Sequence, residues 1–402
     1  MANMFSGWPK DKLAQFCIST TEPDYDVCDN YYLLTDRSVL DGFKHLRKGR
    51  RCDINENIGS EGNTIIAGKK AFKTPFKMMA RRIVWGCKRW KSKEFIEWVD
   101  NFNPDIVYVW NSDAMFILDI ATFVSKKKNI PIVMFNAEGF YFFEKNIYAK
   151  DELLSESVYK LYHFIYKRHF RQMMKRVVLS IHLNSMLRDD YYNAFGGRAI
   201  VLYTGSNLAF DSSNLHLDNP KFSYLGNLAF DRHSALIEVA ETLQSINKDF
   251  KIDIYGQAPT EEVENELKKC YGIAFHGMIP YEEVVKIIYS STILFHAETR
   301  NENFKYYLRY GFSTKIGDSI CSGHPFLMYA PIDIAGAKYV VETGAAWHAQ
   351  DTVELKNKII SILNDEYERN RVLDAARKVA KDNHDAQKNS KLFQEELKNL
   401  IK

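Results

Sequence analysis

Long hydrophobic runs and paired cysteines are both missing from this chain of 402 residues. No window approaches about eighteen unbroken apolar residues, so the sequence predicts no transmembrane helix. Residues 1–12 contain no apolar core of signal-peptide length. The six cysteines form no C-x-x-C pair, and scattered thiols favour a reducing compartment over a disulfide framework or a zinc site. The sequence therefore predicts a cytoplasmic protein that is soluble or peripheral at the inner face of a membrane.

The chain also has little net charge, no short-period repeat and no low-complexity tract. It carries 54 Lys and Arg against 51 Asp and Glu, a formal net charge of +3, which excludes a polycation that binds nucleic acid through its overall charge. Hydrophobic residues make up 46% and aromatic residues 14%, which predicts a large folded core. Two or three domains are expected, since single cores stop growing at roughly 250–300 residues.

Short apolar runs alternate with helical patterns along the chain, which is typical of parallel sheets with crossover helices. In the first half, a helix is predicted over residues 113–127 and strands over residues 105–110, 130–136, 177–184 and 199–205. In the second half, strands are predicted over 221–228, 250–256, 272–277, 292–297, 324–330 and 345–349, with helices over 232–245, 260–269 and 281–290. The beginning differs, because a helical pattern over residues 11–16 leaves no room for a first strand.

A polar stretch, AFDSSNLHLDNP (residues 209–220), divides the chain near residue 215. It is rich in Ser, Asn and Asp and ends in Pro, which is typical of a linker. Two doubly wound α/β units of about 200 residues each are therefore the simplest interpretation. The charged helices after Glu354 either form a solvated surface or return to the first unit.

The first candidate site is the turn that follows the strand predicted at residues 221–225. Ligands bind at the carboxyl ends of parallel strands, where helix N-termini offer free N–H groups and a partial positive charge to phosphates. Gly226 permits close backbone approach, and Arg232 and His233 open the next helix. A cation is unfavourable for the dipole at that end, so its presence indicates an anionic ligand. A surface arginine is the alternative.

The second candidate site is the stretch YGFSTKIGDSICSGHP (residues 310–325). Ser313 or Thr314 is predicted to cap a helix, with Lys315 in its first turn and Asp318 one turn further. Amides, hydroxyls and a lysine would make a phosphate cradle, and the carboxylate of Asp318 suits the vicinal hydroxyls of a ribose. A plain capped helix with solvent-facing side chains is the alternative.

These motifs, in this order, resemble glycosyltransferase family four (group 1), in a variant subgroup with S-T-K-I at the second turn. The resemblance covers roughly residues 100–380 and is carried by G-N-L-x-x-x-R, IDIYG, FHGMIPYEEV and GFSTKIGDSICSGHP. It implies the GT-B architecture, in which two Rossmann-like domains face each other across a cleft. The implied domains are an acceptor-side domain at 1–212, a nucleotide-sugar-binding domain at 213–380 and a C-terminal helix at 381–402 that packs back on the first.

The resemblance also implies the activity. The chain would be a hexosyltransferase that moves a sugar from a nucleotide-diphosphate sugar to a glycan or lipid-linked acceptor in polysaccharide or glycolipid assembly. The reaction would retain the anomeric configuration and need no metal or cofactor, since no D-x-D motif lies near a nucleotide-binding turn. A sugar-nucleotide epimerase on the same fold and a non-catalytic scaffold or binding protein are the alternatives.

The implied site residues fall into two groups. Arg232 and Lys315 would stabilise the charge on the leaving diphosphate, and Glu138, in the loop after residues 130–136, would contact the acceptor or sugar or act as a base. Glu138 at a helix entry on the surface is the alternative, and Asn111 is a weaker candidate. Two positions depart from the family, which has an arginine at Asn227 and an acid at Tyr310. The implied donor-binding residues are Gly226, Asn227, Met278, Ile279, Tyr310, Ser313, Thr314 and Asp318.

Basic residues are concentrated in one segment, residues 69–93, which contains ten Lys or Arg and no acid. Aromatic and aliphatic residues are interleaved with them, and residues 166–176 form a second basic stretch. Such a pattern is typical of a helix on an anionic membrane surface, although a packed helix with a solvated basic face would show it too. No nucleic-acid partner is expected.

Overall fold

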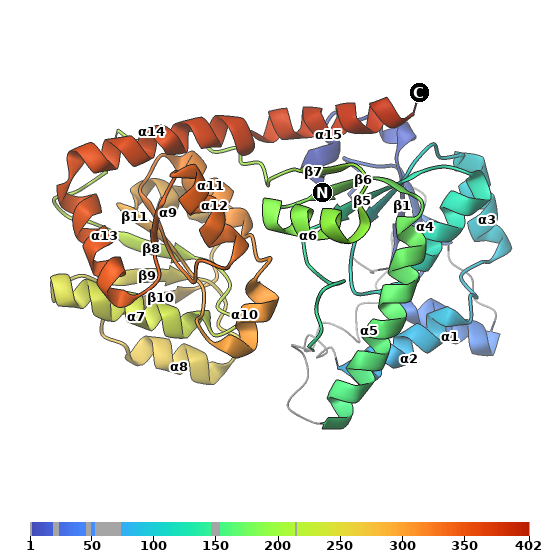
Figure 1. Cartoon of the computed structure of the whole chain (residues 1–402), viewed down its shortest axis with the longest axis horizontal. Coiled ribbons are helices and arrows are strands. Elements are labelled where there is room, and N and C mark those ends of the chain that lie inside the picture. The colour runs from blue at the N-terminus through green and yellow to red at the C-terminus, as the bar shows by residue number, and fades with distance from the viewer. Residues whose placement is uncertain are drawn as a thin grey trace. The chain divides into compact units, whose positions relative to one another are not determined.

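The computed structural model describes residues 2–18, 24–45, 50–52, 74–145, 153–213 and 215–401. The chain divides into two compact units (Figure 1). The first comprises Met1–Ile181, Tyr191–Ile200 and Ser390–Lys402, and the second comprises His182–Asp190 and Val201–Asn389. Residues 201–212 and 381–389 therefore cluster with the second half of the chain.

The second unit is built on a six-stranded sheet in the order β10-β9-β8-β11-β12-β13. Its strands are β8 (Phe222–Leu225), β9 (Ile252–Tyr255), β10 (Ile273–Gly277), β11 (Ile293–Ala297), β12 (Phe326–Tyr329) and β13 (Trp347–Ala349). Every neighbouring pair is parallel. Numbered from β8, the order is 3-2-1-4-5-6, the Rossmann arrangement. The carboxyl ends of all six strands therefore lie on one edge of the sheet. Strands β8 to β10 follow one another in one direction across the sheet and β11 to β13 in the other, so the strand order reverses between β8 and β11.

Helices connect these strands and cover the sheet. They are α7 (Arg232–Ile246), α8 (Glu261–Lys269), α9 (Tyr281–Ser290), α10 (Glu302–Leu308), α11 (Thr314–Ser322), α12 (Ala335–Thr343), α13 (Thr352–Asn364) and α14 (Glu366–Asn383). Their limits have local causes. Thr260 and Asp351 cap α8 and α13 with side-chain oxygens that accept backbone N–H groups. Gly323 and Gly344, in left-handed conformations, end α11 and α12.

The first unit contains a four-stranded sheet in the order β4-β5-β6-β7. Its strands are β4 (Val107–Trp110), β5 (Ile132–Asn136), β6 (Val177–His182) and β7 (Ala199–Val201). All five residues of β5 are buried, as expected for a strand covered on both faces. Helices α4 (Met115–Lys128), α5 (Leu153–Met174) and α6 (Ser185–Phe195) follow β4, β5 and β6, and α15 (Ala386–Leu400) ends the chain.

A second, three-stranded sheet precedes it, in the order β1-β2-β3, with β1 at Ala14–Cys17, β2 at Asn30–Leu33 and β3 at Arg50–Cys52. The remaining elements are α1 (Asp36–His45), α2 (Pro75–Gly86), α3 (Lys93–Phe102) and two 3₁₀ turns at Ala2–Phe5 and Lys10–Lys12.

The prediction of a helix over residues 11–16, with no first strand, is wrong. Residues 10–12 form only a short 3₁₀ turn, and Ala14–Cys17 is strand β1, paired in parallel with β2. Phe16 on this strand stacks on Tyr32 at 6.1 Å between ring centroids and meets Phe95 edge-on at 5.7 Å. These partners lie 16 and 79 positions away in the sequence (32 − 16 and 95 − 16), so no local pattern could reveal them.

Elsewhere the predicted elements of both halves are present. Helix α9 has the predicted limits, and each strand predicted in the second half contains one strand of the sheet. The predicted fold class, α/β with parallel strands in two Rossmann-like units, is confirmed. Among the described helices, none is both long enough and apolar enough to cross a bilayer.

Candidate functional site

The candidate site occupies the carboxyl edge of the second unit's sheet, where β8 and β11 lie side by side. In sheets of this order, the crevice at the reversal point is where ligands bind. Gly226 and Gly256 follow β8 and β9 and touch through their backbones, because a Cβ on Gly256 would lie 1.8 Å from the Gly226 oxygen. The Gly226 N–H donates to the Tyr255 oxygen at 2.8 Å. These glycines bring bare backbone to the edge.

The turn from Gly226 to Arg232 is held by its own hydrogen bonds. The Tyr224 hydroxyl donates to the Asn227 oxygen at 2.8 Å, and the Asn227 side-chain oxygen accepts the Ala229 N–H at 2.7 Å. Phe230 and Asp231 both have φ of 60°, a conformation that costs an ordinary residue roughly 1–2 kcal/mol. Backbone strain of this kind concentrates at binding sites. Asn227, predicted to bind the donor, thus uses its side chain to shape the turn.

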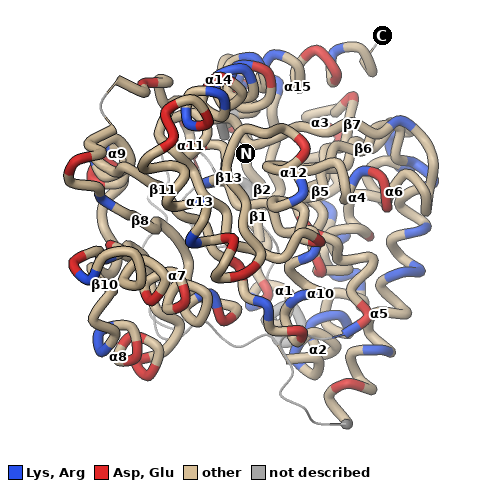
Figure 2. Tube along the Cα trace, turned by 60° about the vertical axis from the view of Figure 1, so that its left-hand side comes forward, with Lys and Arg blue, Asp and Glu red and all other residues tan. Residues whose placement is uncertain are grey.

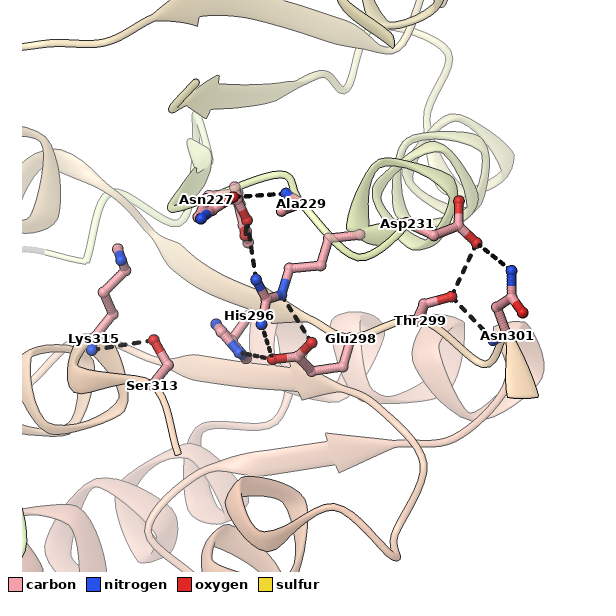
Figure 3. Close-up of polar contacts among 11 residues, drawn as sticks. Asn227, Ala229, Asp231, His296, Glu298, Thr299, Asn301, Ser313 and Lys315 are labelled. Carbon is pink, nitrogen blue, oxygen red and sulfur yellow. Dashed lines mark hydrogen bonds and ion pairs between the residues drawn. The ribbon is translucent and has the colours of Figure 1, made fainter. Parts of the chain in front are cut away.

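Asp231 fixes the turn to the neighbouring strand end. Its Oδ2 accepts hydrogen bonds from the Thr299 hydroxyl at 3.1 Å and from the Asn301 amide at 3.4 Å (Figure 3). Because these two residues follow β11, the carboxylate ties the loops of β8 and β11 together. The left-handed turn is therefore held by side chains from both strands that border the crevice.

Arg232 is the first residue of α7, as predicted, but it already has a partner. Its Nε and Nη2 donate to the two carboxylate oxygens of Glu298, each at 2.8 Å. His296 Nε2 hydrogen-bonds the same carboxylate at 2.9 Å (Figure 3). Glu298 is buried, with 4% of its side chain exposed, and Arg232 is largely buried, with 14% exposed. The third guanidinium nitrogen of Arg232, Nη1, donates to the Asn227 oxygen at the long distance of 3.5 Å.

Opposing effects set the ionisation of this pair. Burial alone would raise the pKa of Glu298, but the His296 hydrogen bond and the Arg232 charge hold it below its ordinary value. Burial likewise disfavours the Arg232 cation, while Glu298 more than compensates and raises its pKa. The pair is therefore charged at neutral pH. Because Glu298 balances its charge, Arg232 carries directed N–H donors rather than an unbalanced charge.

Helix α11 brings the second cation. Ser313 caps this helix, as predicted, by accepting the Lys315 N–H at 3.4 Å, and Thr314 is its exposed first residue. The Lys315 ammonium makes no hydrogen bond or ion pair with any described residue, and no contact is drawn to it in Figure 3. Its pKa is lowered by burial and by the charge of Arg232, against the opposing effect of Asp318. The two cations repel each other beside a helix N-terminus, an arrangement that a bound anion would stabilise.

Asp318 lies one turn along α11 from Lys315. Its Oδ1 accepts a hydrogen bond of 2.6 Å from the Ser206 hydroxyl. Burial raises the pKa of Asp318, although the Ser206 hydrogen bond and the Lys315 charge oppose this. One carboxylate oxygen thus remains for a ligand hydroxyl.

Tyr310, where the resembled family has an acid, is buried and faces an acid. Its hydroxyl donates to Asp190 Oδ2 at 2.6 Å, and its backbone oxygen accepts the Asn184 amide at 3.0 Å. Arg309 binds the same Asp190 oxygen at 3.1 Å. The loop before α11 is thereby fixed to α6, and a carboxylate stands next to Tyr310 although the sequence position carries none.

Met278 and Ile279 follow β10, two strands away from β8 on the same edge. Met278 is 72% exposed and Ile279 is half-buried. Beside them, Tyr255 stacks on His276 at 4.6 Å, and His276 hydrogen-bonds Asp253 at 2.6 Å. The predicted donor residues of the second unit therefore share one sheet edge, with the cations near its middle and these residues toward its rim.

Glu138 and Asn111 belong to the first unit, at the carboxyl ends of β5 and β4. Glu138 is half-buried in a loop that α5 holds through a contact of 3.1 Å between His163 Nε2 and the Phe140 oxygen. Asn111 is 1% exposed and donates to the Asn136 side-chain oxygen at 2.8 Å. Asn111 is thus part of a buried network rather than an open position.

Sequence reasoning missed four residues of this site: His296, Glu298, Ser206 and Asp190. Glu298 had a signal, because it directly follows the apolar run TILFHA and so stands at a strand end. His296 lies within that same run, two residues before Glu298. Ser206 and Asp190 become visible only through contacts between distant segments. Among the described residues, no group of three or more His, Cys, Asp or Glu could hold a metal ion.

The fold, with its parallel sheets in two Rossmann-like units, matches that of GT-B glycosyltransferases of known structure. No protein-family model and no curated protein matches the sequence. Solved structures do match. HepE from Anabaena in complex with UDP gives a TM-score of 0.56 at 15% identity, over 80% of this chain and 89% of that one. HepE with UDP and glucose gives 0.54 at 16%, over 76% and 81%. A glycosyltransferase from Rickettsia africae gives 0.52 at 16%, over 78% and 83%. At these identities the likeness establishes the fold, and the resemblance to family four stays a prediction.

Proposed function

We propose that this chain is a glycosyltransferase whose donor, a nucleoside diphosphate sugar, binds at the carboxyl edge of the β8–β13 sheet. The observation that carries the proposal is Lys315, in the first turn of α11, whose ammonium has no bonded partner among the described residues and lies within the electrostatic influence of Arg232. Structures of HepE in complex with UDP and with UDP-glucose support the donor class.

The two cations have different parts in the proposed reaction. As the bond between the sugar and the diphosphate breaks, negative charge grows on the leaving phosphate oxygen. The Lys315 ammonium supplies the charge that neutralises it, and Arg232, held by Glu298, directs Nη1 toward it. Burial strengthens both interactions, because charges interact more strongly away from water.

The remaining donor contacts follow the edge. The second oxygen of Asp318 accepts from a ribose hydroxyl, while Ser313 and Thr314 offer hydroxyls and backbone N–H groups to the diphosphate. Gly226, without a side chain, allows the diphosphate to approach the backbone. Met278 and Ile279, at the rim, contact the base. Tyr310 and its neighbour Asp190 contact the sugar.

On the acceptor side, Glu138 of the first unit contacts the acceptor or serves as a base. The finer parts of the proposal are a hexose donor, a retaining reaction without a metal, a glycan or lipid-linked acceptor, and a place in polysaccharide or glycolipid assembly. Residues 69–93 would add contact with an anionic membrane. Of these, residues 69–73 lie outside the described residues, and residues 75–86 form α2.

Nucleoside diphosphate release from a panel of nucleotide sugars, measured with and without candidate acceptors, tests the function. We expect acceptor-stimulated release that Lys315→Ala abolishes and that added chelator leaves unchanged. An epimerase would instead change the sugar without releasing the diphosphate. A non-catalytic scaffold would bind nucleotide without turnover.

A further inference from the structure

Helix α5 of the first unit exposes an apolar face that the core does not use. Leu154, Leu161 and Phe164 are 67%, 54% and 69% exposed. At about 100° per residue, these positions fall within roughly 80° around the helix, so they form one stripe. The opposite face is buried, through Tyr159, Tyr162, Tyr166 and Phe170. Helix α5 therefore carries large apolar side chains on its exposed face as well as on its buried face.

Helix α2, which packs against α5, adds to the exposed apolar surface. Its Phe76 and Ile83 are 47% and 58% exposed, and their spacing of seven residues places them on one face. The same helix buries Trp85 at 1% exposure, so its inner side is satisfied by the core. We call these five side chains, Leu154, Leu161, Phe164, Phe76 and Ile83, the outer surface.

The charge of these two helices is one-sided, although that of the whole chain is balanced. Between them they hold one acid, Glu156, and seven cations: Lys77, Arg81, Arg82, Lys160, Lys167, Arg168 and Arg171. Blue segments recur along α5 in Figure 2. Lys77 and Arg168 form no ion pair with any described residue. A surface that combines exposed apolar side chains with unbalanced cations is complementary to an anionic lipid bilayer.

The inner face of α5 connects this surface with the candidate acceptor loops. The Tyr162 hydroxyl donates to the Asp113 oxygen, after β4, at 2.5 Å, and the Tyr159 hydroxyl donates to the Phe143 oxygen, after β5, at 3.0 Å. Glu138 belongs to the second of these loops. An α-helix with its side chains is about 10–12 Å across, so anything docked on the outer face lies about that far from both loops.

We propose that the outer surface of α5 and α2 docks the protein on an anionic bilayer and thereby brings a lipid-borne acceptor to the loops after β4 and β5. The docking itself stands on the exposed side chains and their charge. The role of the acceptor rests on the proposed glycosyltransferase function. A protein partner would be expected to match the cations with acids in localised pairs, whereas a bilayer offers diffuse negative charge over the full length of the helix.

Flotation of the full-length chain with vesicles tests the docking. We expect binding to phosphatidylcholine vesicles that contain phosphatidylserine, little binding to phosphatidylcholine alone, and weaker binding as salt rises. The double variant Leu161→Ser/Phe164→Ser should weaken binding at least about tenfold, because it removes apolar side chains that insert at the interface. The matched control is Val353→Ser/Tyr367→Ser, whose residues are 69% and 82% exposed in the second unit. This control should bind as the parent does.

A charge variant keeps the test independent of any folding defect in the serine variant. Arg168→Glu should also weaken binding, and Lys269→Glu, at an exposed position of α8, should not. Hydrogen exchange of α5 should slow in the presence of the anionic vesicles. The proposal is overturned if the parent ignores anionic vesicles, if it binds neutral ones equally well, or if the α5 variants bind as the controls do. Diphosphate release with a soluble acceptor reports separately on the glycosyltransferase, so either proposal can fail while the other stands.

Discussion

The β4–β7 sheet of the first unit and the β8–β13 sheet of the second unit differ in the polar groups at their carboxyl edges. In the first unit, Asn111 joins Asn136, Tyr166 and Tyr191 in a buried network of neutral groups, with contacts of 2.8, 3.0 and 3.3 Å. In the second unit, the edge holds a buried ion pair and a lysine whose ammonium has no bonded partner among the described residues. A neutral network suffices to fix strand-end loops. Lys315, by contrast, fixes no loop through a side-chain contact with a described residue. This difference favours the second unit as the place to look for a bound anion.

The largest expected effect comes from breaking the buried ion pair with Arg232→Ala. Glu298, only 4% exposed, would lose its counter-charge, and breaking such a pair costs about 3–5 kcal/mol of folding stability. Chemical denaturation at neutral pH measures the loss. Arg232→Lys, which keeps the charge but not both hydrogen bonds, should lose less. If Arg232→Ala is as stable as the parent, the pair does not hold the edge together.

The same variant also changes the dependence of stability on pH. The pKa of Glu298 is lowered in the folded parent, so its contribution to stability is present above the unfolded pKa, near 4.5, and lost as pH falls through the folded value. In Arg232→Ala this loss on acidification should shrink, because the His296 hydrogen bond still lowers the pKa of Glu298 but the Arg232 cation no longer does. Denaturation midpoints from neutral to acidic pH would show the two curves converging. Parallel curves would mean that Arg232 does not set the ionisation of Glu298.

Lys315→Ala should separate activity from stability. The Lys315 ammonium has no bonded partner to lose among the described residues, so the variant should remain about as stable as the parent. Removing the charge that faces the developing oxyanion should cost roughly 2–4 kcal/mol of barrier, which lowers turnover by about two to three orders of magnitude. Donor turnover and thermal denaturation, measured on one preparation, test both halves. Lys269→Ala, at an exposed position of α8 outside the site, serves as the matched control. Undiminished turnover would place the diphosphate elsewhere.

Asp318→Asn should act on binding more than on chemistry. An asparagine oxygen can still accept the Ser206 hydrogen bond of 2.6 Å, so the local structure is kept while the charge is lost. The lost charge-assisted contact with a ribose should weaken nucleoside diphosphate binding by about 1–3 kcal/mol. Calorimetry with the free diphosphate measures this. Ser206→Ala, which leaves the carboxylate in place, should bind more tightly than Asp318→Asn. The reverse order would make Asp318 a purely structural partner of Ser206.

Local pattern predicted much of the second edge. The apolar strands, Arg232 at the start of α7, the Ser313 cap and Lys315 in the first turn of α11 can all be inferred from a few neighbouring residues. The residues that contact these side chains could not be inferred from neighbouring positions. Glu298 meets Arg232 across 66 positions only because β8 and β11 are neighbours in a 3-2-1-4-5-6 order. The functional roles of these residues remain predictions.

The first unit was harder to predict for the same reason. Strand β1 owes its conformation to aromatic contacts with distant residues, and Asn111 is buried by α5 and α6 rather than by its own loop. In both cases, a short polar or ambiguous segment takes its structure from long-range packing. Glu138, by contrast, lies at the strand end where the sequence places it.

The smallest expected effect is a pH dependence of diphosphate binding that Lys315 would cause. Burial and the Arg232 charge lower the pKa of Lys315, so the free protein holds this proton less tightly than an exposed lysine does. A bound diphosphate would favour the charged form and raise that pKa again, which means that binding takes up protons as Lys315 begins to titrate. Diphosphate affinity should therefore fall as pH rises through the lowered pKa of Lys315. Calorimetry in buffers of different ionisation enthalpy should detect the proton uptake. Lys315→Arg, which stays protonated over this range, should bind the diphosphate with little dependence on alkaline pH. If the parent and Lys315→Arg show the same pH dependence, the titrating group is not Lys315, and the second edge does not owe its anion affinity to the unpartnered ammonium.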